Sequence, residues 1–234
     1  MSPSRQTHSN PHPDPIAPTI ASVDPTHPIL YVLDDDLRVR EALHALLSSL
    51  GHHVVLFSDA EQYLAYTRPD TPACLILDLD LPGMTGLELQ RQLSGSAHPP
   101  IIFLTGHGDI PSTVKAMKAG ASEFLSKPFE PADLIRAIDT ALAVDQADRL
   151  KHHDLVEMQQ RHAHLTPRER EVLPYVVAGL LNKQTASELG TSEITIRIHR
   201  GQIMRKMQAQ SLADLVRIAE RLHIPLPETS FNKR

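Results

Sequence analysis

The sequence contains no tryptophan, and phenylalanine and tyrosine together make up only 4% of its 234 residues. A hydrophobic core must therefore be built mainly from Leu, Ile, Val, Ala and Met. The single cysteine, Cys74, excludes an intramolecular disulfide and is typical of a protein in the reducing cytosol. No run of about 18 apolar residues is present, and the N-terminus lacks the apolar core of a secretory signal. We therefore expect a cytoplasmic protein with no membrane association.

The sequence as a whole also lacks an excess of basic residues, since 23 Lys and Arg stand against 28 Asp and Glu. The charge is unevenly distributed, however. Residues 29–145 contain 8 basic and 16 acidic residues, whereas residues 165–223 contain 9 basic and 6 acidic residues. Opposite charges in the two halves of one chain indicate two domains with different partners.

Composition and periodicity predict five segments. Residues 1–28 contain seven of the 19 prolines, and we expect a disordered tail there. An acidic domain over 29–145 is followed by a helical linker over 146–164, a basic domain over 165–223 and a C-terminal tail over 224–234.

The acidic domain alternates short apolar runs with segments of helical period. Four apolar runs cover 29–33, 54–57, 74–77 and 101–104, and a fifth short strand is expected over 123–126. The helical segments cover 39–50, 59–67, 86–94, 111–119 and a stretch that starts near Pro131 and runs into 146–164. Asp36 and Asp59 are expected to be helix N-caps or solvated loop charges. Continuous apolar runs are typical of strands buried on both faces. The pattern therefore predicts a doubly wound α/β domain with a five-stranded parallel sheet, whose functional site lies beyond the carboxyl ends of the strands.

Chemically useful residues follow four of these five strands. Asp34 and Asp35 follow the first strand, Asp78 ends the third, and Thr105 and Lys127 follow the fourth and fifth. Three carboxylates at one sheet edge repel each other and need a cation, and all-oxygen ligands favour Mg²⁺. A hydroxyl and an ammonium at the same edge suit phosphoryl oxygens. One of the carboxylates is therefore equipped to become an acyl phosphate.

Five sequence blocks resemble the receiver domain of two-component response regulators over about residues 29–145. The blocks are YVLDDD (31–36), LILDLDLPGMTG (75–86), LTGHGD (104–109), AMKAGA (116–121) and KPF (127–129). The resemblance implies a flavodoxin-like fold. It also implies that the chain is not an enzyme toward other substrates and takes part only in its own phosphorylation and dephosphorylation.

The same resemblance implies roles for individual residues. Asp78 would accept a phosphoryl group from a sensor histidine kinase, and Thr105 and Lys127 would bind that group. Asp34, Asp35 and Asp78 would hold Mg²⁺ together with the backbone carbonyl of Asp80. Phe124 would be a switch aromatic acting with Thr105, although an ordinary core phenylalanine on a buried strand is the alternative. The Lys127–Pro128 peptide bond would be cis, as in the family.

The pair Asp78 and Asp80 after an apolar strand also resembles the haloacid-dehalogenase phosphatases, which form an aspartyl phosphate and use the second Asp as acid and base. Those proteins place the motif on the first strand of their core. Here it falls on the third strand, and the acidic pair has a strand of its own, so we regard this alternative as the weaker one.

The sequence of the basic domain predicts four helices. Thr166 and Glu169 form a capping-box pattern with Pro167 at the first helical position. Further helices are expected over 182–189, 193–207 and 211–222, and the second and third of the four form a helix-turn-helix pattern. The third has an inward stripe of Ile196, Ile203 and Met207, which leaves Arg197, Arg200 and Gly201 away from it.

This segment resembles the LuxR/NarL-type DNA-binding domain over 165–223, through REREVL (168–173), AGLLNK (178–183) and TIRIHR (195–200). The domain order, with TGHGD at 105–109, is that of the FixJ branch. The resemblance implies that base edges are contacted by Arg197, Ile198 and Gly201, and backbone phosphates by Lys183, Thr195, His199, Arg200 and Lys206. Gly201 departs from the longer side chain often found there, which puts its base contact in doubt.

Two further features of the second half need an interpretation. Pro174 lies inside the first helix of the basic domain and predicts a solvent-facing kink near residues 170–174. Histidines 152, 153, 162 and 164 have no fixed ligand spacing, and we expect them on the surface of the linker rather than in a metal site.

Both resemblances together imply a bacterial response regulator that acts as a transcription factor. Phosphorylation of Asp78 would reorganise the receiver, whose surface over 111–119 and the helix from Pro131 would then form a homodimer. The implied partners are a sensor histidine kinase, promoter DNA and RNA polymerase. A competing interpretation is a regulator that acts through protein contacts only, and the basic recognition helix argues against it.

Overall fold

The computed structural model describes residues 27–95, 97–106 and 110–227. The chain divides into two compact units, Met1–Ala147 and Asp148–Arg234. The predictions made for residues 1–26, for 107–109 of the TGHGD motif and for 228–234 of the C-terminal tail lie outside the described residues.

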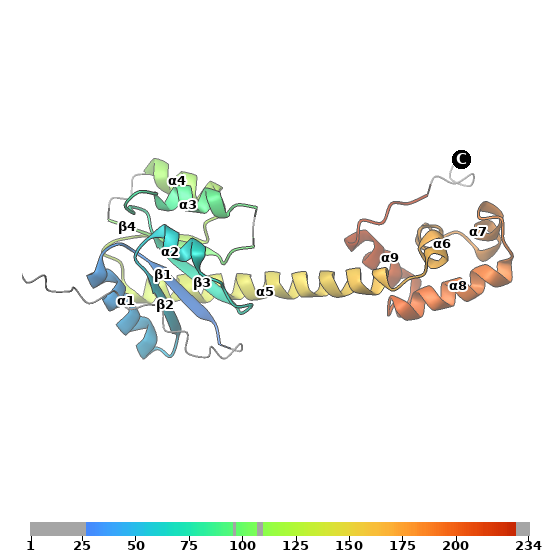
Figure 1. Cartoon of the computed structure of the whole chain (residues 1–234), viewed down its shortest axis with the longest axis horizontal. Coiled ribbons are helices and arrows are strands. Elements are labelled where there is room, and N and C mark those ends of the chain that lie inside the picture. Colours follow the sequence, from blue (N-terminus) through green and yellow to red (C-terminus); the bar gives the residue numbers. More distant parts are fainter. Residues whose placement is uncertain (1–26, 96, 107–109, 228–234) are drawn as a thin grey trace, which may run out of the picture. The chain divides into compact units, whose positions relative to one another are not determined.

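The first unit contains a five-stranded parallel sheet with the strand order β2-β1-β3-β4-β5 (Figure 1). The strands are β1 (Ile29–Leu33), β2 (His53–Phe57), β3 (Ala73–Asp78), β4 (Ile101–Thr105) and β5 (Glu123–Ser126). The helices are α1 (Leu37–Ser49), α2 (Ala60–Ala65), α3 (Gly86–Leu93), α4 (Ile110–Lys118) and the first part of α5 (Pro131–Ala163). The predicted doubly wound five-stranded parallel domain is therefore confirmed.

Helices cover both faces of the sheet, as the continuous apolar strands require. Along β1, Tyr31 and its alternate neighbours face a core shared with α2, α3 and α4, whereas Leu30 and Val32 face a core shared with α1 and α5. Figure 1 shows the same division of the helices between the two faces. All five residues of β1 are fully buried. Each such side chain stabilises the fold by roughly 1.5–3 kcal/mol relative to exposure.

Local capping fixes where several helices begin. Asp36 accepts a hydrogen bond from the backbone N–H of Arg38 at 2.8 Å, and Asp59 accepts one from that of Gln62 at 2.9 Å. Both aspartates are therefore N-caps, as predicted.

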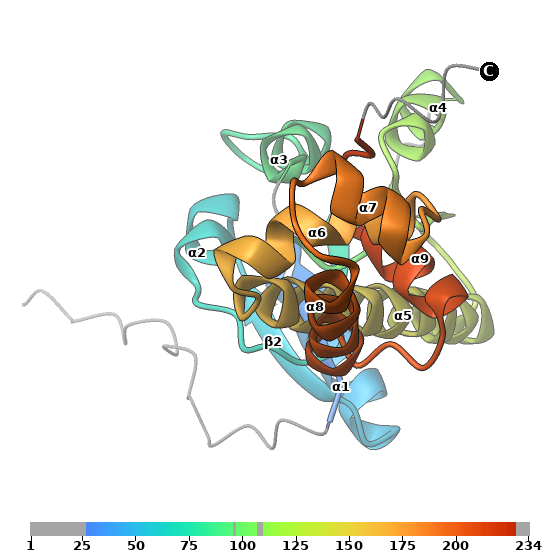
Figure 2. The same ribbon diagram turned by 90° about the vertical axis from the view of Figure 1, so that its right-hand side faces the viewer.

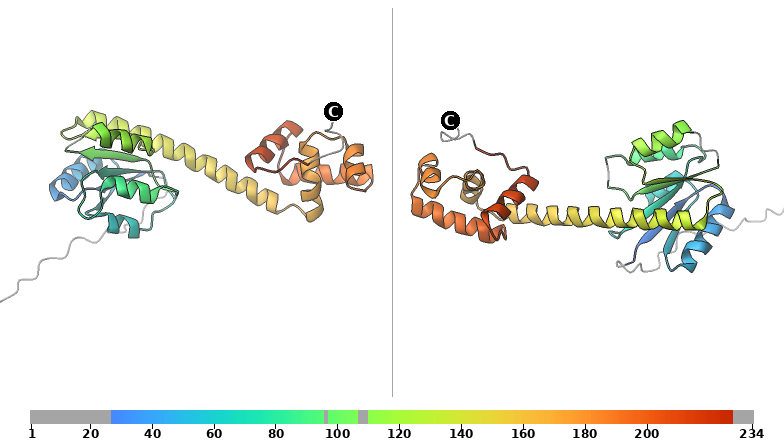
Figure 3. Two further views of the ribbon diagram at one scale, coloured as in Figure 1. Left: turned by 90° about the horizontal axis from the view of Figure 1, so that it is seen from above. Right: turned by 180° about the vertical axis from the view of Figure 1, so that it is seen from behind.

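Helix α5 is one continuous helix of 33 residues (Figure 3). The boundary between the two units falls inside it, after Ala147. A helical linker was predicted over 146–164, and residues 146–163 form the second part of α5. Met158 there packs against the core of the second unit.

The second unit gathers four helices around one apolar core. Figure 2 shows the ribbons of these helices in the foreground. These are α6 (Pro167–Val177), α7 (Asn182–Glu188), α8 (Glu193–Lys206) and α9 (Leu212–Arg221). The predicted inward stripe of α8 is confirmed, because Ile196, Ile203 and Met207 are fully buried. The predicted capping box of α6 is also present, with Thr166 N–H donating to Glu169 Oε2 at 2.7 Å.

Pro174 does not end α6, which continues unbroken to Val177. By helical spacing its ring lies on the side away from the buried Val172 and Val176, and the residue is half-buried. Among the described helices, α5 included, none has the length and apolar character that crossing a bilayer requires.

Candidate functional site

The carboxyl ends of β1 and β3 bring three carboxylates together. Asp34 and Asp78 are 1% and 7% exposed, whereas Asp35 is exposed. One side-chain oxygen from each residue lies within 4.8 Å of the other two. Because the neighbouring β1 and β3 pair Leu33 with Leu77, the residues that follow meet at one point of the sheet edge.

Lys127, which follows β5, completes this cluster. Its ammonium lies 2.6 Å from Oδ2 of Asp34 and 3.0 Å from Oδ2 of Asp78. Its backbone N–H donates to the carbonyl of Thr105 at 2.6 Å, which ties the ends of β4 and β5 together. The Lys127–Pro128 peptide bond is cis, as the resemblance implied.

Burial and neighbouring charges shift the pKa values of Asp78 and Lys127. Burial raises the pKa of Asp78 above its usual value, the hydrogen bond and charge of Lys127 oppose that rise, and the nearby charge of Asp34 adds to it. Burial alone would lower the pKa of Lys127, but its hydrogen bonds to Asp34 and Asp78 outweigh this and raise it. Lys127 therefore counteracts the effect of burial on Asp78, and Asp78 in turn favours the charged form of Lys127.

The charge balance and donor set of the cluster fit Mg²⁺. Three carboxylates and one ammonium leave negative charge unbalanced within this group. Every ligand atom it offers is an oxygen, which is the donor that Mg²⁺ prefers. Within the described residues, the only group of three or more His, Cys, Asp or Glu ligands close enough to share a metal is Asp34, Asp35 and Asp78. The linker histidines therefore form no such group there.

Thr105 and Phe124 also lie near this sheet edge. Thr105 is fully buried at the end of β4. Phe124 on β5 is half-buried and packs against the core beneath α2, α3 and α4. It pairs with Phe103 on β4, and the centroids of the two rings are 6.2 Å apart. Phe124 thus contacts the core while remaining partly accessible.

Sequence reasoning missed two residues that shape the site. Arg40 donates from Nη1 to the backbone carbonyl of Asp34 at 2.6 Å. Gly86 lies so close to the end of β3 that a Cβ there would be 2.5 Å from the backbone oxygen of Asp78. Neither role leaves a pattern in the sequence, because both depend on distances between separate elements.

In the second unit, α7, a short turn and α8 form the predicted helix-turn-helix. Lys183 is exposed in the first turn of α7, and the side chain of Arg197 on α8 is 70% exposed. Ile198 is 59% exposed. Arg197 has one acidic neighbour, Glu193, at 3.7 Å on the same helix.

The other predicted DNA contacts are less exposed. Thr195, His199 and Arg200 are half-buried, and Thr195 shares a hydrogen bond with Ser192 at 2.8 Å. Lys206 has an internal partner, since its ammonium lies 2.6 Å from Oε2 of the buried Glu169. The phosphate contact predicted for Lys206 therefore competes with an ion pair inside the unit.

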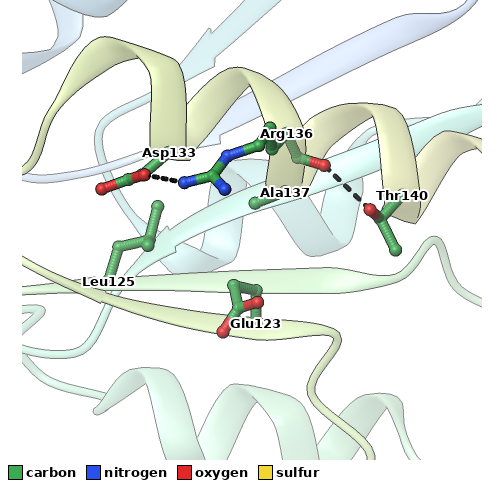
Figure 4. Close-up of a pocket in the computed structure, with 6 residues that line it drawn as sticks. All are labelled: Glu123, Leu125, Asp133, Arg136, Ala137 and Thr140. Atoms are coloured by element: carbon green, nitrogen blue, oxygen red, sulfur yellow. Dashed lines mark hydrogen bonds and ion pairs between the residues drawn. The ribbon is translucent and has the colours of Figure 1, made fainter.

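A groove of about 430 Å³ lies elsewhere on the first unit, between β5 and α5 (Figure 4). Glu123 and Leu125 line it from β5, and Asp133, Arg136, Ala137 and Thr140 line it from α5. The carboxylate cluster contributes no residue to it, so this groove is a separate feature.

Comparison with known families also divides the chain into two domains. The response regulator receiver domain family matches residues 30–139, and the luxR family of bacterial regulatory proteins matches residues 163–219. Nodulation protein W of Bradyrhizobium diazoefficiens is 46% identical over 205 residues, which cover 87% of this chain and 90% of that protein. The chain is a two-component response regulator. Its receiver domain is joined to a LuxR-type DNA-binding domain.

Other relatives agree with this assignment. The transcriptional regulatory protein FixJ of Bradyrhizobium diazoefficiens is 42% identical over 195 residues, covering 82% of this response regulator and 94% of FixJ. A solved structure of the response regulator StyR is 46% identical to this chain and has a TM-score of 0.75. The match covers 84% of this chain and 100% of the StyR chain. The weaker interpretation as a haloacid-dehalogenase phosphatase is thereby set aside, and so is a regulator without a DNA-binding domain.

Proposed function

We propose that Asp78 accepts a phosphoryl group from a sensor histidine kinase. The observation that carries this proposal is the buried Asp78 carboxylate at the end of β3, 3.0 Å from the Lys127 ammonium. A carboxylate oxygen of Asp78 forms the new bond to phosphorus while the bond from phosphorus to the kinase histidine breaks. The Lys127 ammonium and the Thr105 hydroxyl then bind phosphoryl oxygens. The chain acts on its own aspartate and on no other substrate.

Asp34, Asp35 and Asp78, together with the backbone carbonyl of Asp80, would hold Mg²⁺ at this site. When bound, the ion supplies positive charge that neutralises the phosphoryl oxygens. The protein positions the carboxylates: Asp36 N–H donates to Oδ1 of Asp34 at 2.9 Å, and Lys127 bridges Asp34 and Asp78.

Labelling with acetyl phosphate and Mg²⁺ tests the phosphoacceptor. We expect one labelled residue in the wild type and none in Asp78→Asn. Asp80→Asn is the matched control, because the proposal uses only the backbone of Asp80, and it should remain labelled. Asp35→Ala should lower the affinity for Mg²⁺ directly, and it should lower labelling only as a consequence of that weaker binding. Undiminished label in Asp78→Asn would reject the assignment.

We further propose that α8 reads bases in the major groove while neighbouring residues bind phosphates. The exposure of Arg197 and Ile198 supports base contacts, and the exposure of Lys183 supports a phosphate contact.

Lys183→Ala should weaken binding to specific and random DNA alike and lower the salt slope of binding by about one unit. Arg197→Ala should cost roughly 1–3 kcal/mol on the specific site and much less on random DNA. Equal losses on both DNAs would make Arg197 a phosphate contact.

We propose that phosphorylation drives homodimerisation through the α4, β5 and α5 face of the receiver. Val114 and Met117 on α4 are 44% and 43% exposed, and the groove of Figure 4 lies between β5, the last strand of the sheet, and α5. A dimer presents two DNA-binding domains to promoter DNA and can then contact RNA polymerase in the cytoplasm.

A further inference from the structure

The outward face of α8 carries two exposed isoleucines. Ile194 and Ile198 are 67% and 59% exposed and lie four residues apart, so they are neighbours on one helix face. Helical spacing places Gly201 and Arg205 on the same stripe. This stripe lies opposite the buried side of α8, which is formed by Ile196, Ile203 and Met207. The isoleucines therefore contribute little to the core of the domain.

Gly201 is a second, independent feature of this stripe. It lies inside α8, where glycine lowers helix stability relative to alanine. Its φ is not in the positive range, and a Cβ added to it would meet no atom within 4 Å. The fold itself therefore does not require glycine at this position. A molecule that approaches the backbone of α8 closely would require it.

The surrounding charge identifies the kind of molecule that fits. Helix α8 contains four basic residues and one acidic residue, and the Arg197 side chain beside the stripe is 70% exposed. An apolar strip flanked by cations matches the major groove, whose phosphates are negative and whose thymine bases each present a methyl group. An apolar protein surface would match the isoleucines but not the flanking cations.

We propose that Ile194 reads a thymine methyl group beside the base contact already proposed for Ile198, as a specificity-determining residue in its own right, and that Gly201 permits the close approach of α8. The missing side chain at Gly201 allows α8 to lie deep in the groove, and the two isoleucines then contact methyl groups at the base edges. This inference rests on the proposed DNA-binding function of α8 and names the feature of DNA that the helix recognises.

The test uses a DNA site selected from a random duplex library by the phosphorylated full-length chain. Each thymine of that duplex is replaced in turn by uracil, which removes only the methyl group. We expect replacement of at least one thymine in each half-site to lower wild-type affinity about threefold to fivefold, as the loss of one buried methyl implies. Ile194→Ala should bind the thymine duplex more weakly and should no longer distinguish the two bases at one of these positions.

Two further variants separate recognition from folding. Gly201→Ala should unfold at a higher temperature than the wild type and yet bind the selected duplex more weakly. Leu150→Ala is the matched control, because Leu150 is 61% exposed in the same unit but lies on α5. It should bind both duplexes as the wild type does.

Equal wild-type affinity for the thymine and uracil duplexes would overturn the inference while leaving the DNA-binding function intact. Retained thymine preference in Ile194→Ala would overturn the role of that residue. A Gly201→Ala variant that binds DNA as well as the wild type would overturn the close approach. If Ile194→Ala binds DNA normally but fails to support transcription with RNA polymerase, the isoleucines are a protein contact and the inference is wrong. Failure to select any sequence would contradict the proposed function itself.

Discussion

Gly86 shows how one missing side chain shapes the end of β3 beside the carboxylate cluster. A Cβ at this position would lie 2.5 Å from the Asp78 backbone oxygen and 3.1 Å from the Phe103 ring. Gly86→Ala must therefore displace the end of β3, and we expect it to lower the free energy of unfolding by about 1–3 kcal/mol and to reduce labelling of Asp78. Urea unfolding and acetyl phosphate labelling measure the two effects. Gly201→Ala is the control, because a Cβ at Gly201 would meet no atom within 4 Å, and it should not lower the free energy of unfolding. Equal losses of unfolding free energy in the two variants would contradict the steric argument.

Glu169 and Lys206 form an ion pair that the local sequence pattern does not reveal. Glu169 is buried and also accepts the Thr166 N–H of the capping box. Lys206→Ala leaves this carboxylate without its cation, and we expect a loss of about 1–3 kcal/mol in stability. Lys183→Ala removes an exposed lysine of the same domain and should leave stability nearly unchanged. The salt slope of DNA binding gives a second measurement: a slope lowered by about one unit in Lys206→Ala would show that Lys206 contacts phosphate after all.

The same pair predicts a pH dependence. Burial alone would raise the pKa of Glu169, but the hydrogen bonds from Lys206 and Thr166 outweigh burial and lower it. The ionised form therefore stabilises the native state. This contribution is present above the ordinary glutamate pKa of about 4.3 and is lost as the pH falls through the lowered native value. The stability difference between wild type and Lys206→Ala should be constant from about pH 6 to 7 and shrink below about pH 4. A difference that grows on acidification would contradict this sign.

At the scale of elements, Asp145 on α5 completes the hydrogen bonding of β3. The backbone N–H groups of Ala73 and Leu75 point toward β4, and Leu75 N–H donates to Pro100 at 2.9 Å. Ala73 lies beyond the start of β4, and its N–H donates instead to Oδ2 of Asp145 at 2.9 Å in a buried contact. The start of the strand that carries Asp78 is thus attached to α5, the helix that continues into the second unit.

Removal of this contact should loosen α5 from the sheet. Asp145→Ala leaves a buried N–H without its acceptor, and we expect a loss of about 1–3 kcal/mol and faster hydrogen exchange at Ala73. Asp145→Asn keeps an acceptor oxygen and should lose less. Asp139→Ala, an exposed aspartate on the same helix, is the control. Unchanged exchange at Ala73 in Asp145→Ala would show that this contact does not stabilise the strand.

The elements themselves were predictable because their signals are local. Buried strands appear as continuous apolar runs, and Asp36, Asp59 and Thr166 precede helices at the positions where capping requires them. The convergence of Asp34 and Asp78 follows from parallel topology alone. The contacts of Asp145 with Ala73 and of Lys206 with Glu169 join residues 72 and 37 positions apart. No periodicity specifies such distances, so the structure was needed to find them.

At the scale of the whole molecule, the two domains have opposite charge and complementary tasks. The segment 29–145 has twice as many acidic as basic residues, and the segment 165–223 has a basic excess. The acidic receiver offers the negative charge that the proposed Mg²⁺ site needs, and the basic excess of the second domain suits the proposed contact with DNA. A single DNA-binding domain offers only one half-site, so affinity for a two-fold site depends on pairing two chains.

Phosphorylation should therefore raise dimer content and DNA affinity together. Sedimentation at micromolar concentration should show a shift toward the dimer, and affinity for a two-fold site should rise on the order of 10²-fold because the second half-site is bound intramolecularly. Met117→Glu places a charge on the exposed face of α4 and should abolish the dimer while Asp78 is still labelled. Leu64→Glu places the same charge on α2, where Leu64 is 37% exposed, and should dimerise normally. Full affinity for the two-fold site from a chain that remains monomeric after phosphorylation would show that pairing is not the switch. Loss of the dimer in both variants would move the interface away from α4, because the charge on α2 would then be equally disruptive.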